Sequence, residues 1–378
     1  MNNYVLKREE EAMYKLRSLY RSYGYSQYKM SKFEEYDLYV RNKNFLVSDN
    51  IITFTDHTGR LLALKPDVTL SIVKNSRDVV GKVNRIYYNE NVYRVAPGSH
   101  DFREIMQVGL ECIGEIDTYL VSEVLTLAAQ SLERVANWPS PDSPDYLLEI
   151  SHLDIVARVL DGLNIGGEAR AALLGCLAEK NAHDMARICA EQGVSKEQVE
   201  ALLKLVTTYG CPQEVWPTLD ALAEGNESLR DPVAELKQTL QGLPALVRDK
   251  VRIDFSLIND MNYYNGIVFR GYIKGIPDGI LSGGRYDGLM RKMDRCSDAI
   301  GFAVYLDLLE DYDSATPEDA CFDTVILYDE ATDLAELALT VTAHTQKGER
   351  VTTLRALPAQ TQIMQVLDLR KKEGTIDE

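Results

Sequence analysis

The sequence predicts an α+β protein in which one domain is divided along the chain by a helical insertion. Strand patterns run from about residue 50 to residue 114 and return after residue 250. The stretch Leu153–Leu246 is rich in Ala, Leu, Glu and Lys with repeated helical spacing. We therefore expect a split core at residues 1–145 and 250–312, a helical insertion at 146–249 and a small α/β segment at 320–378.

The first part of the chain combines one helix with several strands. Apolar residues recur at helical spacing between Glu11 and Tyr23, and Gly24 is suited to end that helix. A hairpin is expected over Asn50–Leu64, where the turn sequence Asp-His-Thr-Gly separates two apolar runs. Further strands are predicted at Arg85–Tyr88, Val92–Val95 and Glu104–Gly114.

Turn-rich linkers separate the later parts. One covers Pro139–Pro144 and a second, acidic one covers Asp311–Asp319. Between them, the core should continue with strands, a glycine-rich loop and a helix, at Val251–Phe255, Ile267–Ile273, Ser282–Arg285 and Tyr305–Leu309. The C-terminal segment predicts strand, helix, strand and a final helix, at Thr324–Tyr328, Leu334–His344, Arg350–Leu354 and Thr361–Lys372.

The composition disfavours several classes of protein. The 378 residues carry a formal net charge of -17, whereas binding to nucleic acid requires a basic face that neutralises phosphates. No apolar run approaches the ~20 residues of a membrane helix, and the N-terminus lacks a signal peptide, so we expect a cytoplasmic protein without a membrane or nucleic-acid partner. The six cysteines show no metal-site spacing, so we expect buried reduced thiols and neither metal nor cofactor.

The predicted strand Ile105–Ile113 carries the most informative pattern. Alternation places Met106 and three further apolar side chains on one face, which must belong to the core. The other face carries Gln107 and Glu111, with Gly109 between them leaving space against the sheet. An amide and a carboxylate in line could hold a small cationic or zwitterionic ligand. A solvated sheet face is the alternative interpretation.

Two other segments are weak signals by themselves. The paired aromatics of Asn262–Gly266 precede an Asn-Gly sequence, which is typical of a tight turn beside strands. The glycines of Ser282–Gly288 would let the backbone approach a ligand, but such loops are common and carry no phosphate-binding fingerprint. Neither segment predicts a site alone.

Taken in order and spacing, these segments resemble the histidyl-tRNA synthetase family from the N-terminus to about Leu309. Leu64–Thr69 is similar to its first histidine-binding segment, Arg-Pro-Glu-Gly-Thr. Its motif 2, its histidine-specific segment and the region up to motif 3 are matched by Val92–Glu111, Leu257–Phe269, Ser282–Leu289 and Ala299–Leu309. The resemblance implies a class II aminoacyl-tRNA synthetase fold, built on an antiparallel sheet with flanking helices. It implies histidine binding by Asp67, Thr69, Arg94, Gln107, Glu111, Tyr263 and Tyr264.

Departures from the family pattern affect the ATP side of the site. Ala96 stands where motif 2 carries a glutamate, and the catalytic arginine of the histidine-specific segment falls on Asn259. The arginine of motif 3 falls on Leu308. Adenylation develops negative charge on phosphate, so losing two arginines should cost several kcal/mol of transition-state stabilisation, about 10²-fold in rate for each. We therefore expect no catalytic residues.

A chain of this kind resembles the regulatory-subunit family of ATP phosphoribosyltransferase. In that family a synthetase paralogue pairs with a short catalytic subunit, which performs the first step of histidine biosynthesis. The resemblance implies activation of that partner, feedback inhibition by histidine, and a homodimer within a larger hetero-oligomer, with Phe33–Leu64 in the dimer interface.

Two other functions stay open at this stage. One is histidyl-tRNA synthetase itself, and the other is a synthetase-like sensor of histidine or tRNA with a different partner. The C-terminal segment resembles the start of the family's anticodon-binding domain, in truncated form, and its role is open.

Overall fold

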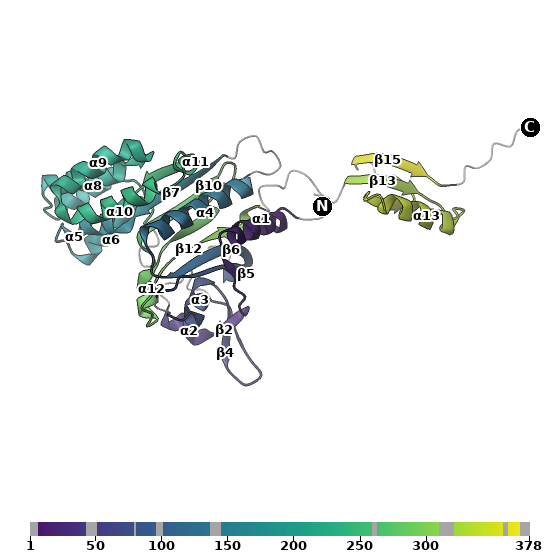
Figure 1. The fold of residues 1–378 in the computed structure, drawn as a ribbon, viewed down its shortest axis with the longest axis horizontal. Coiled ribbons are helices and arrows are strands. Elements are labelled where there is room, and N and C mark those ends of the chain that lie inside the picture. The colour runs from purple at the N-terminus through teal and green to yellow at the C-terminus, as the bar shows by residue number, and fades with distance from the viewer. Residues whose placement is uncertain are drawn as a thin grey trace, which may run out of the picture. The chain divides into compact units, whose positions relative to one another are not determined.

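The computed structural model describes residues 7–42, 51–78, 81–95, 101–136, 145–258, 263–309, 321–357 and 362–370. The chain divides into two compact units. The larger unit, Arg8–Glu310, holds the main sheet and its helices, and the smaller one holds the strands and the helix of the C-terminal segment (Figure 1). The two predicted linkers, Pro139–Pro144 and Asp311–Asp319, lie outside the described residues.

A nine-stranded sheet forms the centre of the larger unit. Neighbouring strands are antiparallel except for β1 with β5 and β7 with β9, which are parallel. In spatial order the strands are β1 (Ser26–Gln27), β5 (Asn84–Val95), β6 (Phe102–Gly114), β12 (Asp298–Tyr305), β11 (Leu281–Arg285), β10 (Asn265–Ile273), β7 (Tyr146–His152), β9 (Val251–Asp254) and β8 (Tyr209–Gly210). Strands from the first and second parts of the predicted split core pair with each other in this one sheet, which confirms the predicted α+β fold.

Three predictions for this sheet were wrong in detail. The strands expected at Arg85–Tyr88 and Val92–Val95 are one strand, β5, because β6 pairs with it along its whole length. Ser282–Arg285 belongs to β11 rather than a loop, since β10 and β12 hydrogen-bond to it on both sides. The helix expected at Tyr305–Leu309 is a single 3₁₀ turn, Leu306–Leu309, and Tyr305 ends β12.

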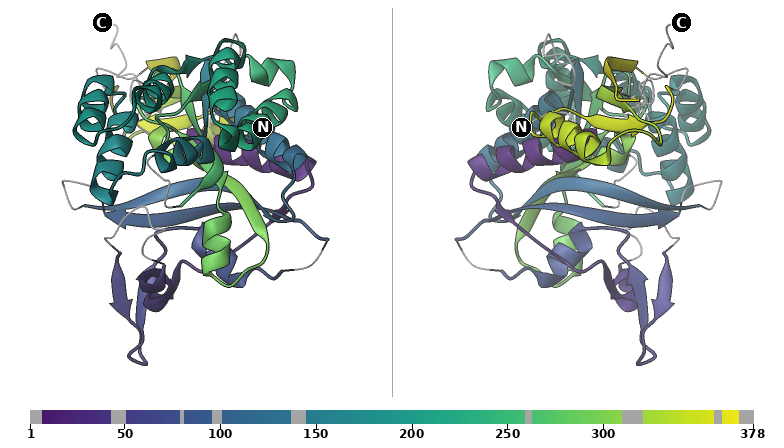
Figure 2. Two further views of the ribbon diagram at one scale, coloured as in Figure 1. Left: turned by 90° about the vertical axis from the view of Figure 1, so that its left-hand side faces the viewer. Right: turned by 90° about the vertical axis from the view of Figure 1, so that its right-hand side faces the viewer.

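Helices and a small sheet cover the two faces of the main sheet. On one face, α1 (Arg8–Ser22) and α4 (Thr118–Ala136) pack with the insertion helices around the larger apolar core (Figures 1 and 2). Gly24 follows α1 with a φ of 83°, as expected of a glycine at a helix end. A second core on the other face contains residues of α3 (Thr69–Asn75), α12 (Asp287–Lys292), α2 (Tyr36–Arg41) and the β2–β4–β3 sheet (Phe33–Glu35, Leu61–Leu64 and Thr53–Thr55).

The predicted helical stretch lies between β7 and β9. Its helices are α5 (Leu153–Asp161), α6 (Gly167–Ala178), α7 (Ala182–Glu191), α8 (Lys196–Thr207), α9 (Pro212–Gly225), η2 (Glu227–Leu229), α10 (Arg230–Gln241) and α11 (Ala245–Arg248). Ser195 begins α8 with a capping box, in which the Ser195 hydroxyl and the Gln198 side chain each accept a backbone N–H of the other. β7 and β8 of the main sheet also come from residues 146–249, so these residues are not helical throughout.

The C-terminal unit is a parallel sheet, β14–β13–β15, with one helix. Its elements are β13 (Cys321–Leu327), α13 (Leu334–Thr345), β14 (Val351–Leu354) and β15 (Gln362–Asp368). The final helix expected at Thr361–Lys372 is wrong, because the middle of that stretch pairs with β13 as β15. An apolar run of this length fits either a helix or a strand, and here pairing with β13 makes it a strand.

The structure also tests two expectations drawn from the composition, which concern the cysteines and membrane-spanning helices. Cys112, Cys176 and Cys189 are buried free thiols, but Cys211 is half-buried and Cys296 is exposed, so the expectation of burial was wrong for those two. The side chain of Cys321 lies outside what the structure describes. Across the described ranges, no helix is both long enough and apolar enough to cross a bilayer.

Candidate functional site

Glu111 occupies the centre of the site. The predicted alternation of β6 is confirmed, and Val108, Leu110 and Cys112 face the larger core. The opposite face is covered rather than solvated, because Glu111 is only 2% exposed and Gln107 only 3%. Burial raises the pKa of Glu111 to about 8, although two hydroxyl donors act against this shift.

Those two hydroxyls hold the Glu111 carboxylate in place. Thr69 Oγ1 donates to one oxygen at 2.9 Å, and the Tyr286 hydroxyl donates to the other at 2.7 Å. Thr69 begins α3 and Tyr286 precedes α12, so two separate elements converge on one carboxylate. A buried carboxyl fixed in this way can accept further hydrogen bonds when ionised and can donate one when protonated.

Glycines form the floor of the site beneath these side chains. Gly109, Gly301 and Gly284 are paired with Tyr88, Glu111 and Gly301 in neighbouring strands of the same sheet. A Cβ at Gly301 would collide with the Glu111 carboxylate, and one at Gly284 would lie 2.7 Å from the Tyr264 ring. The space expected above Gly109 is taken by the Tyr88 hydroxyl, 2.5 Å from where a Cβ would lie, so that space is not open to a ligand.

Asp67 lies on the segment that leads into α3, and Arg94 lies on β5 next to that segment. Asp67 is buried, and its Oδ1 accepts the N–H of Leu70 at 2.9 Å, which holds the first turn of the helix. Arg94 Nε donates to the carbonyl of Pro66 at 3.0 Å. Burial raises the pKa of Asp67, whereas the positive charge of Arg94 lowers it.

The two tyrosines of the turn also reach the site. The rings of Tyr263 and Tyr264 pack edge to face with centroids 4.6 Å apart, and Tyr263 lies 6.0 Å from the Tyr286 ring. Burial raises the pKa of Tyr263, and the nearby charges of Asp67 and Glu111 raise it further. Since Gln107 shares the Glu111 face of β6, the structure brings all seven predicted residues to one region.

Sequence reasoning missed Tyr286 and Tyr88. Tyr286 lies within the Ser282–Gly288 segment, where only the glycines were considered, although an aromatic hydroxyl next to them is itself a signal for a polar ligand. Tyr88 shares a face of β5 with Glu90, and its pairing with Gly109 of β6 could be seen only once β5 was known to be continuous.

Of the three positions where the chain departs from the family's ATP-binding residues, the structure describes only Leu308. Leu308 lies in the 3₁₀ turn after β12 and packs against the larger core, so it offers an apolar side chain and no charge. Ala96 and Asn259 lie outside the described residues.

The fold and the site together define a class II synthetase-like domain with a buried, tyrosine-rich polar cluster around Glu111. The family described as histidyl-tRNA synthetase matches residues 4–309. The match covers most of the chain, and the protein therefore belongs to the histidyl-tRNA synthetase family.

Individual relatives carry two different names. An ATP phosphoribosyltransferase regulatory subunit from Oceanobacillus iheyensis is 28% identical over 295 residues, which is 76% of this chain and 70% of the relative. A histidine–tRNA ligase from Methanocaldococcus jannaschii is also 28% identical, over 78% of this chain and 69% of the relative. Sequence identity alone therefore does not separate the two groups.

Solved structures agree on the fold. An ATP phosphoribosyltransferase regulatory subunit/histidyl-tRNA synthetase from Bacillus halodurans C superposes with a TM-score of 0.75 at 23% identity, covering 96% of this chain and 94% of that one. A chain from the ATP phosphoribosyl transferase (HisG:HisZ) complex of Thermotoga maritima superposes with a TM-score of 0.56 at 17% identity, covering 79% of this chain and 97% of that one. The class II synthetase-like fold is confirmed.

Proposed function

We propose that this protein is a non-catalytic regulatory subunit of ATP phosphoribosyltransferase, which activates a short catalytic subunit and transmits feedback inhibition by histidine. The observation that carries the proposal is the buried carboxyl of Glu111, which Thr69 and Tyr286 hold, together with Leu308 at the position where the family carries the arginine of motif 3. The names of the Oceanobacillus and Thermotoga proteins support a role next to a catalytic partner.

The proposed ligand, histidine, matches the chemistry of the pocket. Its imidazole has two nitrogens, and a carboxylate with neighbouring phenol groups can satisfy both. Glu111 and the tyrosines would hold the ring, while Asp67, Thr69 and Gln107 would receive the α-amino group. Feedback then requires that histidine binds one quaternary state of the complex more tightly than another.

Reconstitution tests the regulatory role directly. The purified chain is mixed with a short-form ATP phosphoribosyltransferase catalytic subunit, and activity is measured with and without histidine. We expect the mixture to be more active than the catalytic subunit alone and histidine to lower that activity. An unchanged rate in the mixture would contradict the activating role. Co-purification with the same subunit separates this role from that of a histidine or tRNA sensor with a different partner.

Histidyl-tRNA synthetase is the second candidate, favoured by the Methanocaldococcus relative. It predicts histidine-dependent exchange of pyrophosphate into ATP. We expect no exchange above background, because Leu308 cannot stabilise the charge that develops on phosphate. An authentic histidyl-tRNA synthetase serves as the positive control, and a comparable rate from this chain would establish the second candidate instead.

A further inference from the structure

An ion cluster lies at the end of β11, beside the Glu111 site. Arg285 is the last residue of this strand, and three carboxylates surround its guanidinium. Its Nε donates to Asp287 at 2.7 Å and its Nη2 donates to Asp298 at 2.9 Å, while Glu235 lies 3.6 Å from Nη1. These acids belong to α12, β12 and α10, so one arginine joins β11 to three other elements.

This cluster holds both chain neighbours of Tyr286, which lies between Arg285 and Asp287. The Tyr286 N–H donates to the Ala299 carbonyl at 2.9 Å, and Asp287 Oδ1 accepts the Ala299 N–H at 3.0 Å. From this position the Tyr286 hydroxyl donates to Glu111 at 2.7 Å. The placement of that hydroxyl therefore depends on where the cluster holds the end of β11.

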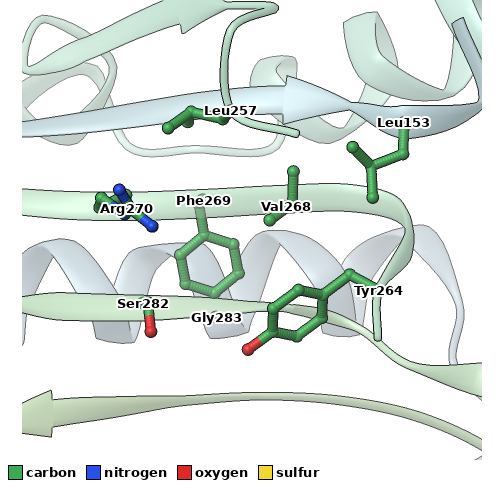
Figure 3. A pocket seen from close by; sticks show the side chains of 8 residues that line it. All are labelled: Leu153, Leu257, Tyr264, Val268, Phe269, Arg270, Ser282 and Gly283. Carbon is green, nitrogen blue, oxygen red and sulfur yellow. The ribbon is translucent and has the colours of Figure 1, made fainter. Parts of the chain in front are cut away.

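A second tyrosine of the site is tied to the same cluster. Asp287 Oδ2 accepts a hydrogen bond from Asn265 Nδ2 at 3.0 Å, and Asn265 directly follows Tyr264 in the chain. Figure 3 shows the Tyr264 ring beside Gly283 of β11. One carboxylate thus holds the chain next to two of the tyrosines that surround Glu111.

Glu235 differs from the other two acids because it lies in the helical stretch between β7 and β9. Its Oε2 is 3.4 Å from Nε2 of His152, a fully buried residue at the end of β7, and its Oε1 faces Arg285. A hydrogen bond with His152 lowers the pKa of Glu235, so the carboxylate opposite Arg285 is ionised at neutral pH. Of the three contacts to the guanidinium, this one is the longest, and the Glu235 side chain is 36% exposed. It is therefore the contact that can open without unfolding the core.

From these contacts we infer that Glu235 is the residue through which the helical insertion sets the position of Tyr286 at the Glu111 site. Glu235 and Arg285 are positioning residues, since each acts through Tyr286. When α10 shifts, Glu235 and the guanidinium separate, whereas the other two acids stay with the core and keep the charge of Arg285 satisfied. A molecule that binds the insertion can then alter the ligand site from a distance. This role rests on the proposed function, which supplies the ligand, while the link itself can be measured without one.

Hydrogen exchange of the ligand-free protein tests the link. Glu235→Gln removes the charge opposite Arg285, and the apolar residues of α10 remain in the larger core, so the variant should fold. We expect the backbone amides of residues 285–290 to exchange about 2-fold to 5-fold faster than in wild type, with the amides of β5 unchanged. Asp220→Asn is the matched control, because it removes the ion pair of Asp220 with Lys237 on the same helix, α10, and should leave residues 285–290 unchanged.

Histidine binding then shows whether the link acts through Tyr286. We expect Glu235→Gln to weaken binding about 2-fold to 5-fold in the wild-type background and to have no further effect in the Tyr286→Phe background. The reason is that Tyr286→Phe already lacks the hydroxyl that Glu235 positions. Asp220→Asn should bind histidine like wild type. Equal weakening by Glu235→Gln in both backgrounds would overturn the role of Tyr286.

The two measurements separate this link from the proposed function. Unchanged exchange at residues 285–290 in Glu235→Gln would overturn the link, even if the wild-type chain binds histidine. Faster exchange throughout the protein would also overturn it, because that result indicates general destabilisation. Faster exchange confined to residues 285–290, without histidine binding by wild type, would support the link and contradict the proposed function.

Discussion

At the scale of single residues, Glu111 determines what the site can recognise. Glu111→Gln keeps the shape of the side chain but replaces a carboxyl, which can ionise beside a ligand nitrogen, by an amide that cannot, so we expect histidine binding to weaken by about 1 to 3 kcal/mol. Calorimetry measures this loss. Glu104→Gln, an exposed carboxylate on the same strand, is the control and should bind histidine like wild type. Unchanged binding by Glu111→Gln would show that the pocket is a relic of descent.

Glutamine is a better probe at this position than alanine. The sequence pattern places the core on the other face of β6, and if the core lay only there, Glu111→Ala would leave folding intact. The structure corrects this, because Glu111 is buried and accepts hydrogen bonds from Thr69 and Tyr286. Alanine would leave both hydroxyls without an acceptor and would create a cavity, each of which destabilises the fold.

The raised pKa of Glu111 predicts a pH dependence of stability. Its pKa is about 8 in the folded chain and near 4.5 without burial, so the folded state binds more protons between these values. The contribution is fully present below pH 4.5 and is lost as pH rises through about 8. We expect wild type to lose stability relative to Glu111→Gln between pH 5 and pH 8.5, by up to about 1.4 kcal/mol for each pH unit. Urea unfolding of both proteins across this range measures it, and parallel curves would contradict it.

At the scale of elements, a buried ion pair joins the segment before α3 to β5. Lys65 is fully buried, and its Nζ donates to Glu90 at 3.0 Å and to the Ser31 carbonyl at 3.2 Å. Lys65→Met leaves Glu90 without its partner, so we expect a loss of about 3 to 5 kcal/mol in the free energy of unfolding. The double variant Lys65→Met/Glu90→Leu should recover much of this loss. If the losses of Lys65→Met and of Glu90→Leu alone simply add up to the loss of the double variant, the two residues are not coupled.

The helices and strands also show where sequence patterns were sufficient to predict secondary structure. Local spacing predicted α1, the β3–β4 hairpin and the alternation of β6, because each depends on its own residues. It divided β5 at Asn89–Asn91, whose polar side chains resemble a turn until β6 is seen beside them. It assigned Ser282–Arg285 to a loop for the same reason, since only pairing with two neighbours makes such glycines a strand. Tertiary pairing, which a single sequence does not display, decided each of these cases.

The candidate site was predicted more completely than the sheet that carries it. Resemblance supplied Asp67, Thr69 and the paired tyrosines, and the structure brings them around Glu111. Tyr286 was missed because its contact with Glu111 joins residues 175 positions apart in the chain.

At the scale of the whole molecule, two exposed aromatic side chains form an apolar patch on the small sheet. Phe33 is 46% exposed and Phe54 39%, and their rings meet edge to face at 5.7 Å on the β2–β4–β3 sheet. Both rings lie in the segment expected to form the dimer interface. A homodimer through this sheet is our proposal for the subunit's own assembly.

Substitution in this patch tests the assembly. We expect wild type to sediment as a dimer at micromolar concentration and Phe33→Glu/Phe54→Glu as a monomer, because two charges would be buried without partners in the interface. Tyr119→Glu is the control, since Tyr119 is more exposed than either residue and lies on α4. A monomeric wild type, or a double variant that remains dimeric, would contradict the interface.

The glycine floor of the site limits how the protein could evolve a new specificity. Most binding pockets change their depth by exchanging one side chain for another, but here main-chain atoms of β11 and β12 form the bottom wall. Any side chain at Gly301 would displace the Glu111 carboxylate, so a shallower pocket cannot arise by a tolerated single step. A deeper one would require a strand to move away from paired neighbours on both sides. Substitutions around the site can therefore change the side chains that surround it, whereas its depth is inherited with the sheet.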